Sequence, residues 1–527
     1  MRFFRRVSAP QLRHLGAGVV LLLMAAGASA QTSQVALPPT AADDLDAAEA
    51  LFRLGDDVER KPVPVATSRV TYGAHVDLAL TASAGEPRTT LAFDTMTRPR
   101  LGSSYVFKTD ELLQPMASRV YPSARLTVNA EWEALDWLLV RGLVDTGQIR
   151  EGSQLEPAVA GLVIAGSPAG DAITSLDIVR ELSVTLGKRS FTLEIGRFRT
   201  GLADGLVYDG FGAGARVRLD LNPIAALAWR VELVAVGLAD RLSRTLRNPL
   251  LALRIVHELS LFESVSVFGA WVWDDNGALS DVLRSALAER ALNQPRVLDA
   301  LFSNDRGYAS LAFAGADAQL VLAPGLLLRA AVTGSIGAFS IAVGGAFGSQ
   351  ERQRHFDLLA GAANAELRYD LGSSFEGVAY AFALSGDGPP QQGKTYHAFM
   401  SPAPYWIWTG LFFSGGLNQS LFEDRAALGG VHGHGVAGGG PGLTWTNKPW
   451  LVDVRALWLQ ALSAPPSAPW GGGGRSYGLE CDVRGKWRVI AGLDLGAEVD
   501  VLFAADYFPV QRVAYRALGI VSYTYAN

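Results

Sequence analysis

The chain has 527 residues, of which 49% are hydrophobic and 57 are glycine, and its formal charge is −5. An acidic balance argues against nucleic acid as a partner, and the single Cys481 excludes an intramolecular disulfide. A secreted chain of this size without disulfides needs another way to hold its fold, and a closed ladder of backbone hydrogen bonds would provide one.

Residues 1–30 have the pattern of a secretory signal peptide. Four arginines precede an apolar run at 15–26, and Ala28, Ser29 and Ala30 form a small-residue cleavage site. The run is too short to span a bilayer, so we expect this segment to be removed. Its removal takes the formal charge from −5 to −9, because it holds four arginines and no acid. Residues 31–68 are predicted to be a periplasmic lead-in, partly disordered.

Alternation of apolar and polar residues begins at Val70 and recurs along the chain. In residues 213–221 the apolar side chains share one face, while Arg216, Arg218 and Asp220 fall on the other. A period of two places such sets on opposite faces of a sheet, and segments of about ten residues suit a tilted membrane strand. The sequence therefore predicts an all-β fold in the Gram-negative outer membrane. Residues 69–527 would form a transmembrane antiparallel β-barrel of about 18 strands, within roughly 16 to 20.

Aromatic residues and connections agree with this architecture. An interfacial girdle would place aromatic side chains near strand ends, and plain cross-strand packing is the alternative. The candidates are Trp271, Trp273, Trp406, Trp408, Trp450, Trp458, Tyr523 and Tyr525. We expect tight turns at 324–325, 372–374 and 447–449, and long connections at 147–172, 274–306, 385–405, 419–435 and 461–474. Residues 280–292 look helical. The pattern leaves open whether 308–322 is one strand or two, and whether the Gly-rich run 436–445 is a strand.

The sequence does not indicate an enzyme. It contains no Gly-x-Ser-x-Gly motif. Asp204 and Asp209 could do acid–base work, but charges that solvate a loop or line the lumen are the simpler account. His432 and His434 have no third ligand nearby for a metal ion, and residues 274–277 resemble a calcium loop without its later acid. We therefore expect no catalytic residue, no metal site and no cofactor.

Charged residues on the polar faces are the strongest candidates for function. A charge that faces lipid at mid-depth costs about 2–4 kcal/mol, so these side chains should face the lumen. They could form a lattice of salt bridges that stiffens the barrel, or a ladder of guanidinium donors for an anionic or hydroxyl-rich solute. The predicted lumen and substrate-path residues are Arg197, Arg199, Arg216, Arg218, Asp220, Arg230, Glu232, Arg254, Arg368, Asp370, Asp453, Arg455, Glu480, Asp482 and Arg484.

Three stretches resemble the alginate-export family of outer-membrane barrels. The first has Gly196-Arg197, Gly201, Gly205, Tyr208-Asp209 and Gly214-Ala-Arg216-Val-Arg218. The second has Gly478-x-Glu480-x-Asp482 and a terminal box at 503–508, in which Ala505 stands where the family usually has Gly. The third, fainter stretch runs from Tyr396 to Gly410. The resemblance implies an 18-stranded exporter with a basic constriction, and it would place Arg197, Arg216 and Arg218 near the lumen.

On this basis we expect a passive outer-membrane channel that exports an exopolysaccharide. Its partners would be the secreted polysaccharide, outer-membrane lipid, and periplasmic and inner-membrane machinery that synthesises and exports the polymer. A general or anion- or sugar-selective diffusion porin is the first alternative. A surface-structural barrel or adhesin with a closed lumen is the second.

Overall fold

The computed structural model describes residues 69–84, 119–145, 149–150, 179–188, 190–222, 228–238, 248–274, 279, 307–343, 352–388, 393–406, 408–413, 426–465, 472–508 and 513–526. The expected signal peptide, the lead-in and the expected helix at 280–292 lie outside these residues. No helix in the described part is long and apolar enough to cross a membrane.

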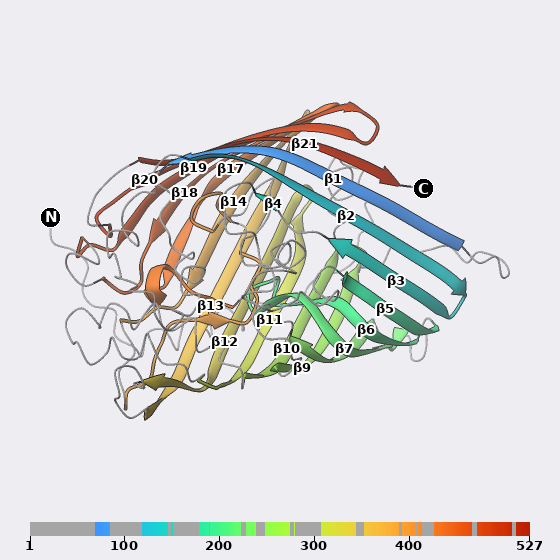
Figure 1. Cartoon of the computed structure of the whole chain (residues 1–527), viewed down its shortest axis with the longest axis horizontal. Helices are drawn as coiled ribbons and strands as arrows, with labels where there is room; N and C mark the ends of the chain where they lie inside the picture. The colour runs from blue at the N-terminus through green and yellow to red at the C-terminus, as the bar shows by residue number, and fades with distance from the viewer. Residues whose placement is uncertain are drawn as a thin grey trace, which may run out of the picture. The chain divides into compact units, whose positions relative to one another are not determined.

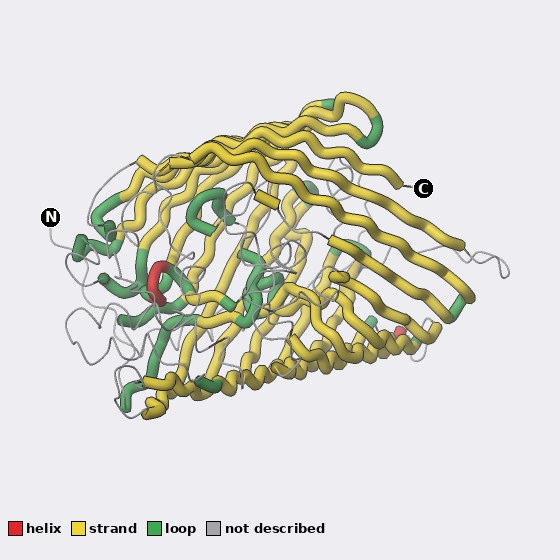
Figure 2. Tube along the Cα trace, in the orientation of Figure 1, coloured by secondary structure: helices red, strands yellow, loops and turns green. Residues whose placement is uncertain are grey.

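Nearly all of the described chain is β-strand (Figure 2). The wall strands are β1 (Arg69–Ala84), β2 (Arg119–Leu135), β3 (Leu138–Asp145), β5 (Val179–Lys188), β6 (Phe191–Leu202), β7 (Tyr208–Asp220), β8 (Trp229–Leu238), β9 (Asn248–Ser260), β10 (Glu263–Asp274), β11 (Ala309–Ala323), β12 (Leu326–Val343), β13 (Arg352–Gly372), β14 (Phe375–Leu384), β17 (Val436–Asn447), β18 (Trp450–Gln460), β19 (Ser476–Ile490), β20 (Leu493–Ala504) and β21 (Val513–Ala526). The short β4 (Ile149–Arg150) also pairs with β2. Outside the wall, β15 (Met400–Ser401) pairs with β16 (Ala427–Leu428), and a 3-10 turn, η2, covers Val431–Gly433.

Each wall strand pairs antiparallel with the next, and the last strand pairs with the first (Figure 1). The closing register runs from Gly73 opposite Ala526 to Ala84 opposite Tyr515. This is a closed antiparallel barrel of 18 wall strands, which confirms the predicted fold and strand number. Residues 309–323 are one strand, and the Gly-rich run is the strand β17.

The two ends of the barrel differ in their connections. One end carries tight turns, including 324–325, 373–374 and 448–449, together with the start of β1 and the end of β21. We call it the tight-turn end. The other, the long-connection end, carries the links 85–118, 275–308 and 385–435. Outer-membrane barrels have short periplasmic turns and longer extracellular loops, so the 275–308 connection begins and ends on the extracellular side.

The alternation in the sequence appears as two different surfaces. Outward side chains are exposed and apolar, such as Leu78 (55%), Leu233 (51%) and Ile336 (62%). Between them, Asp77 and Glu232 are buried on the inner face. An apolar exterior around a closed ladder satisfies every demand of a bilayer, and it locates the chain in the Gram-negative outer membrane, as predicted. Cys481 alternates with the exposed Leu479 and Val483 on the outer face.

The predicted girdle is right for some aromatic residues and wrong for two. Trp271, Trp273, Trp450, Trp458, Tyr523 and Tyr525 are exposed on the outer face. Trp406 and Trp408 are buried, and they lie in no strand. Their segment belongs to the connection between β14 and β17, and it folds into the barrel.

Candidate functional site: a strap across a charged lumen

The inner face of the wall has two zones. Toward the tight-turn end, strands β8, β13 and β18 carry charged side chains inside, such as Arg230 and Glu232 on β8 and Asp453 and Arg455 on β18. Toward the long-connection end, the inward positions of the same strands become apolar. They include Val234, Val236 and Leu238 on β8, Phe356 and Leu358 on β13, and Leu457 and Leu459 on β18, all of them buried. We call these the charged zone and the apolar zone.

Residues 396–406 and 408–413, here called the strap, cover the apolar zone from inside. The ring of Trp408 stacks on Phe382 of β14 with centroids 4.3 Å apart, and Phe399 meets Phe313 of β11 at 6.4 Å. Phe399, Trp406 and Phe412 are fully buried. An apolar inner wall would be costly against water, so the strap and the apolar zone bury each other as a core within the lumen.

The end of the β6–β7 hairpin forms the first anchor of the strap. Residues 198–202 of β6 have no described partner on β5, and residues 208–211 of β7 have none on β8, so the hairpin end leaves the wall. The edge of this hairpin end binds the strap through backbone hydrogen bonds. The N–H of Asp209 donates to the Ala403 carbonyl (2.7 Å), and that of Tyr405 donates to the Gly205 carbonyl (2.9 Å).

The turn of this hairpin has an unusual backbone. Ala203, Asp204 and Gly205 have φ of 57°, 50° and 77°, in the left-handed region that only Gly adopts without cost. A Cβ on Gly205 would lie 2.9 Å from the Cβ of Tyr405. The strained turn is therefore held by its contact with the strap, and such strain persists only where the surroundings fix it.

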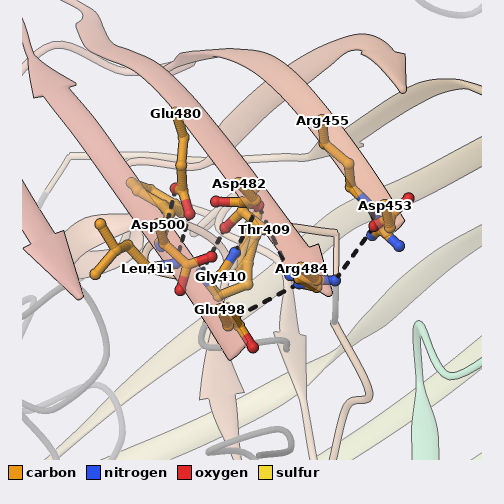
Figure 3. A network of polar contacts seen from close by, with 12 residues as sticks. Thr409, Gly410, Leu411, Asp453, Arg455, Glu480, Asp482, Arg484, Glu498 and Asp500 are labelled. Carbon is orange, nitrogen blue, oxygen red and sulfur yellow. Dashed lines mark hydrogen bonds and ion pairs between the residues drawn. The ribbon is translucent and has the colours of Figure 1, made fainter. Parts of the chain in front are cut away.

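Glu480 and Asp482 of β19 form the second anchor (Figure 3). The N–H of Gly410 donates to Asp482 Oδ2 at 3.0 Å, and the N–H groups of Leu411 and Phe412 donate to the Glu480 carboxylate, the latter at 3.0 Å. Both carboxylates are fully buried. A Cβ at Gly410 would lie 2.2 Å from Asp500 Oδ1, so only glycine allows this approach. The strap thus contacts β13, β14 and β19, and the hairpin end of β6 and β7 extends into the lumen to meet it, where Asp204 of its turn accepts from Asn364 of β13 (3.3 Å).

Charged side chains behind the second anchor form a continuous network. Arg484 reaches Asp453 (4.0 Å), Asp482 (3.7 Å) and Glu498 (3.5 Å). Arg516 of β21 lies 2.8 Å from both Glu498 and Asp500. Five of the predicted path residues, Asp453, Arg455, Glu480, Asp482 and Arg484, therefore gather on β18 and β19 beside the strap (Figure 3).

Other predicted residues occupy the charged zone in separate ion pairs. Arg216 contacts both Glu194 and Glu232, and Arg218 lies 3.7 Å from Glu232. Arg230 pairs with Glu258 (3.2 Å), Arg254 with Asp317 (2.8 Å), and Arg368 with Glu366 and Glu376. Asp220 and Asp370 instead accept backbone N–H groups of tight turns, from Asn222 (2.9 Å) and Gly372 (2.8 Å).

Arg197 and Arg199 were expected in the lumen together with Arg216 and Arg218. In the structure they do not share the face of those two residues. Along β6 they alternate with Glu194 and Phe198 and have the parity of the exposed Ile195. Arg199 lies where the hairpin has left the wall, pairs with Asp209 (2.7 Å) and sits 5.8 Å from the ring of Tyr405. Alternation along β6 by itself puts both arginines on the face of Ile195, and the expectation that Arg197 lies near the lumen came from the resemblance to the alginate-export family.

The alternatives for metal binding and catalysis gain no support. In the described part of the chain, no three His, Cys, Asp or Glu side chains form a group that could hold a metal ion. The buried His434 places Nδ1 2.7 Å from the Tyr507 hydroxyl. Asp274 accepts the N–H of Leu279 (2.6 Å) within its connection, as a turn would require. Asp204 accepts from Asn364 (3.3 Å) and Asp209 from Arg199, so the two acids do not form a pair.

The strap is not among the elements predicted from the sequence, although the sequence contains a signal for it. Strands such as 229–238 are apolar on both faces at one end, which requires a cover on the inside as well as lipid outside. The run from Trp406 to Phe413 is the apolar segment that supplies it.

No known family model matches the chain, and no curated protein matches it. The resemblance to the alginate-export family therefore stays a prediction. Solved structures with similar strand arrangement include OpdQ of Pseudomonas aeruginosa, with a TM-score of 0.46 and 10% identity over 87% of this chain and 98% of that chain. OccAB4 of Acinetobacter baumannii has a TM-score of 0.45 and 8% identity over 87% and 98%. The outer-membrane protein opdK of P. aeruginosa has 0.45 and 9% over 87% and 99%. At these values the strand pairing of the chain, and not the likeness, establishes the fold.

Proposed function

We propose that the chain is a passive outer-membrane diffusion channel that prefers small anionic solutes. The observation that carries this proposal is an asymmetry within the ion pairs of the charged zone. In the pairs Arg141–Glu131, Arg254–Asp317 and Arg368–Glu366 the arginine side chain is 22%, 28% and 33% exposed, and its acid is 10%, 15% and 22% exposed. The carboxylates lie close to the wall, and the guanidinium groups extend further toward the lumen.

This asymmetry decides what a solute meets. Arg has a longer side chain than Asp or Glu, so a balanced pair still presents its positive end to the water in the pore. The same order holds for Arg216 and Glu194, Arg218 and Glu232, Arg455 and Asp453, and Arg516 and Glu498. Arg230 and Glu258 have the reverse order, at 19% and 47%, whereas Arg484 and Asp453 are nearly equal at 9% and 10%, and Arg368 and Glu376 are equal at 33%. Guanidinium groups bind carboxylate and phosphate through paired donors, which supports passage of solutes with those groups.

Reversal potentials in planar bilayers test the proposal. The purified barrel, in a salt gradient, is expected to pass chloride in preference to potassium, and Arg254→Ser with Arg368→Ser is expected to reduce that preference. Glu258→Gln, which removes the one exposed acid of the set, should raise it. A cation preference in the unmodified protein would overturn the proposal.

Export of an anionic polysaccharide is the second candidate, and one observation favours it. The three stretches that resemble the alginate-export family become the β6–β7 hairpin end, the strap, and the β19 anchor with residues 503–508, and they meet in the lumen. An exporter should leave small-anion uptake unchanged when its gene is deleted, while secretion of the polymer stops. A diffusion channel should show the opposite result.

A further inference from the structure

We propose that Glu480 and Asp482 are positioning residues that set the width of the channel by holding the strap tip, residues 408–413, against β19. This inference rests on the proposed channel function, and it concerns two acids that would not themselves need to touch the solute. Three consecutive backbone N–H groups of the tip, from Gly410 to Phe412, point at these two carboxylates. Hydrogen bonds from backbone N–H to a buried carboxylate are shorter and stronger than neutral ones.

The rest of the strap does not fix the tip in the same way. Residues 401–406 are bonded to the hairpin end by backbone groups and by Ser401 Oγ, which donates to the Val207 carbonyl (2.5 Å). Those bonds would keep the first half of the strap in place without β19. Beyond Trp406, the rings of the tip pack on Phe382, on Tyr477 and on one another, and such apolar contacts are non-directional. The backbone of the tip is oriented by its hydrogen bonds to Glu480 and Asp482 and by a local bond from the Phe413 N–H to Thr409 Oγ1 (3.0 Å).

The wall beside the second anchor carries more acidic than basic side chains. Glu480, Asp482, Glu498 and Asp500 lie on neighbouring strands, and Arg484 and Arg516 are the cations placed among them. Asp482 Oδ1 and Asp500 Oδ1 are buried without a hydrogen-bond partner. Burying acids in this way is costly unless they are paired or hydrogen-bonded. The tip amides reduce that cost, and in return the carboxylates determine where the tip lies.

Loss of the two carboxylates should therefore release the tip and leave the wall closed. Three buried N–H groups would lose their acceptors, and a buried donor without an acceptor favours a conformation in which water reaches it. The β18–β19 and β19–β20 ladders consist of backbone hydrogen bonds and do not depend on these side chains. A released tip, still joined to the rest of the strap, would no longer lie against β19, so the open width of the lumen would change.

The test compares Glu480→Ala with Asp482→Ala as a double variant, the isosteric Glu480→Gln with Asp482→Asn, and the control Asp494→Ala. Asp494 lies on β20, is buried, and pairs with Lys486 and Arg488 away from the strap. Heat-modifiable migration on gels establishes that each barrel is folded. Two readouts follow, the single-channel conductance and cleavage by chymotrypsin after Trp408, Phe412 or Phe413, mapped by mass spectrometry.

We expect cleavage within 408–413 and a severalfold change in conductance in the alanine double variant, smaller changes in the isosteric one, and neither change in Asp494→Ala. Continued protection of 408–413 in both double variants would overturn the positioning role. Cleavage with unchanged conductance would show that the tip is held by these acids but does not set the width, which also overturns the proposal. A barrel that conducts in no variant, released or not, would instead contradict the channel function.

Discussion

Asp145 shows what a single carboxylate does inside this wall. It accepts two hydrogen bonds from Arg125, and Arg180 lies 3.7 Å away, with all three side chains at most 6% exposed. Asp145→Ala would remove the carboxylate that both buried guanidinium groups approach, and breaking a buried pair costs about 3–5 kcal/mol. We expect a loss of that size in the free energy of unfolding, measured by urea titration of the barrel in lipid.

Glu258→Ala provides the matched comparison at the same scale. Its side chain is 47% exposed and pairs with Arg230 at 3.2 Å, and an exposed ion pair contributes about 0–1 kcal/mol. Equal losses for the two variants would contradict the assignment of Asp145 to a buried cluster. The sequence does not distinguish these two acids, because burial depends on the strands and connections that cover each of them.

The strap is the element that the sequence alone did not predict. Aromatic residues are common near the strand ends of membrane barrels, so the sequence predicts an interfacial position for Trp406 and Trp408. What sends them inward is the apolar zone, which depends on several strands distant in sequence. The wall strands were predictable because each carries its own alternation. The strap was not, because its environment is assembled by the tertiary structure.

Replacing residues 404–413 with a flexible Gly–Ser linker of equal length separates the roles of strap and wall. The wall ladder contains none of these residues, so the barrel should still assemble and migrate as a heat-modifiable band. Conductance should rise, because the bulky side chains of this part of the strap no longer occupy the lumen. The preference for anions should remain, because Arg254 and Arg368 lie on the wall. Loss of anion preference together with the strap would place selectivity on the strap and not on the charged zone.

At the scale of the whole molecule, division of the inner wall into two zones explains why a segment of the chain lies inside the barrel. The apolar zone can be stable only when covered, and the strap that covers it is bonded to the β6–β7 hairpin end and to β19. The charged zone needs no cover, because its acids and arginines satisfy one another and water satisfies the rest. The three stretches noted in the sequence are therefore the two anchors and the strap between them.

Closure of the wall by β1 and β21 makes the most direct prediction about the molecule as a whole. Leu78 lies opposite Val521 on the outer face, 55% and 42% exposed, and directly opposed residues of antiparallel strands have Cβ atoms about 4.5–5.5 Å apart. With Cys481 changed to Ala, cysteines introduced by Leu78→Cys and Val521→Cys should form a disulfide, because these distances fall near those a disulfide requires. The oxidised, heat-unfolded chain would then migrate as a closed loop that reductant opens. Leu78→Cys combined with Leu233→Cys, which lies on β8 away from the closure, should not cross-link within one chain. Failure of the first pair, or cross-linking of the second, would mean that the wall closes in a different register or by different strands, and the assignment of every inner and outer face would change with it.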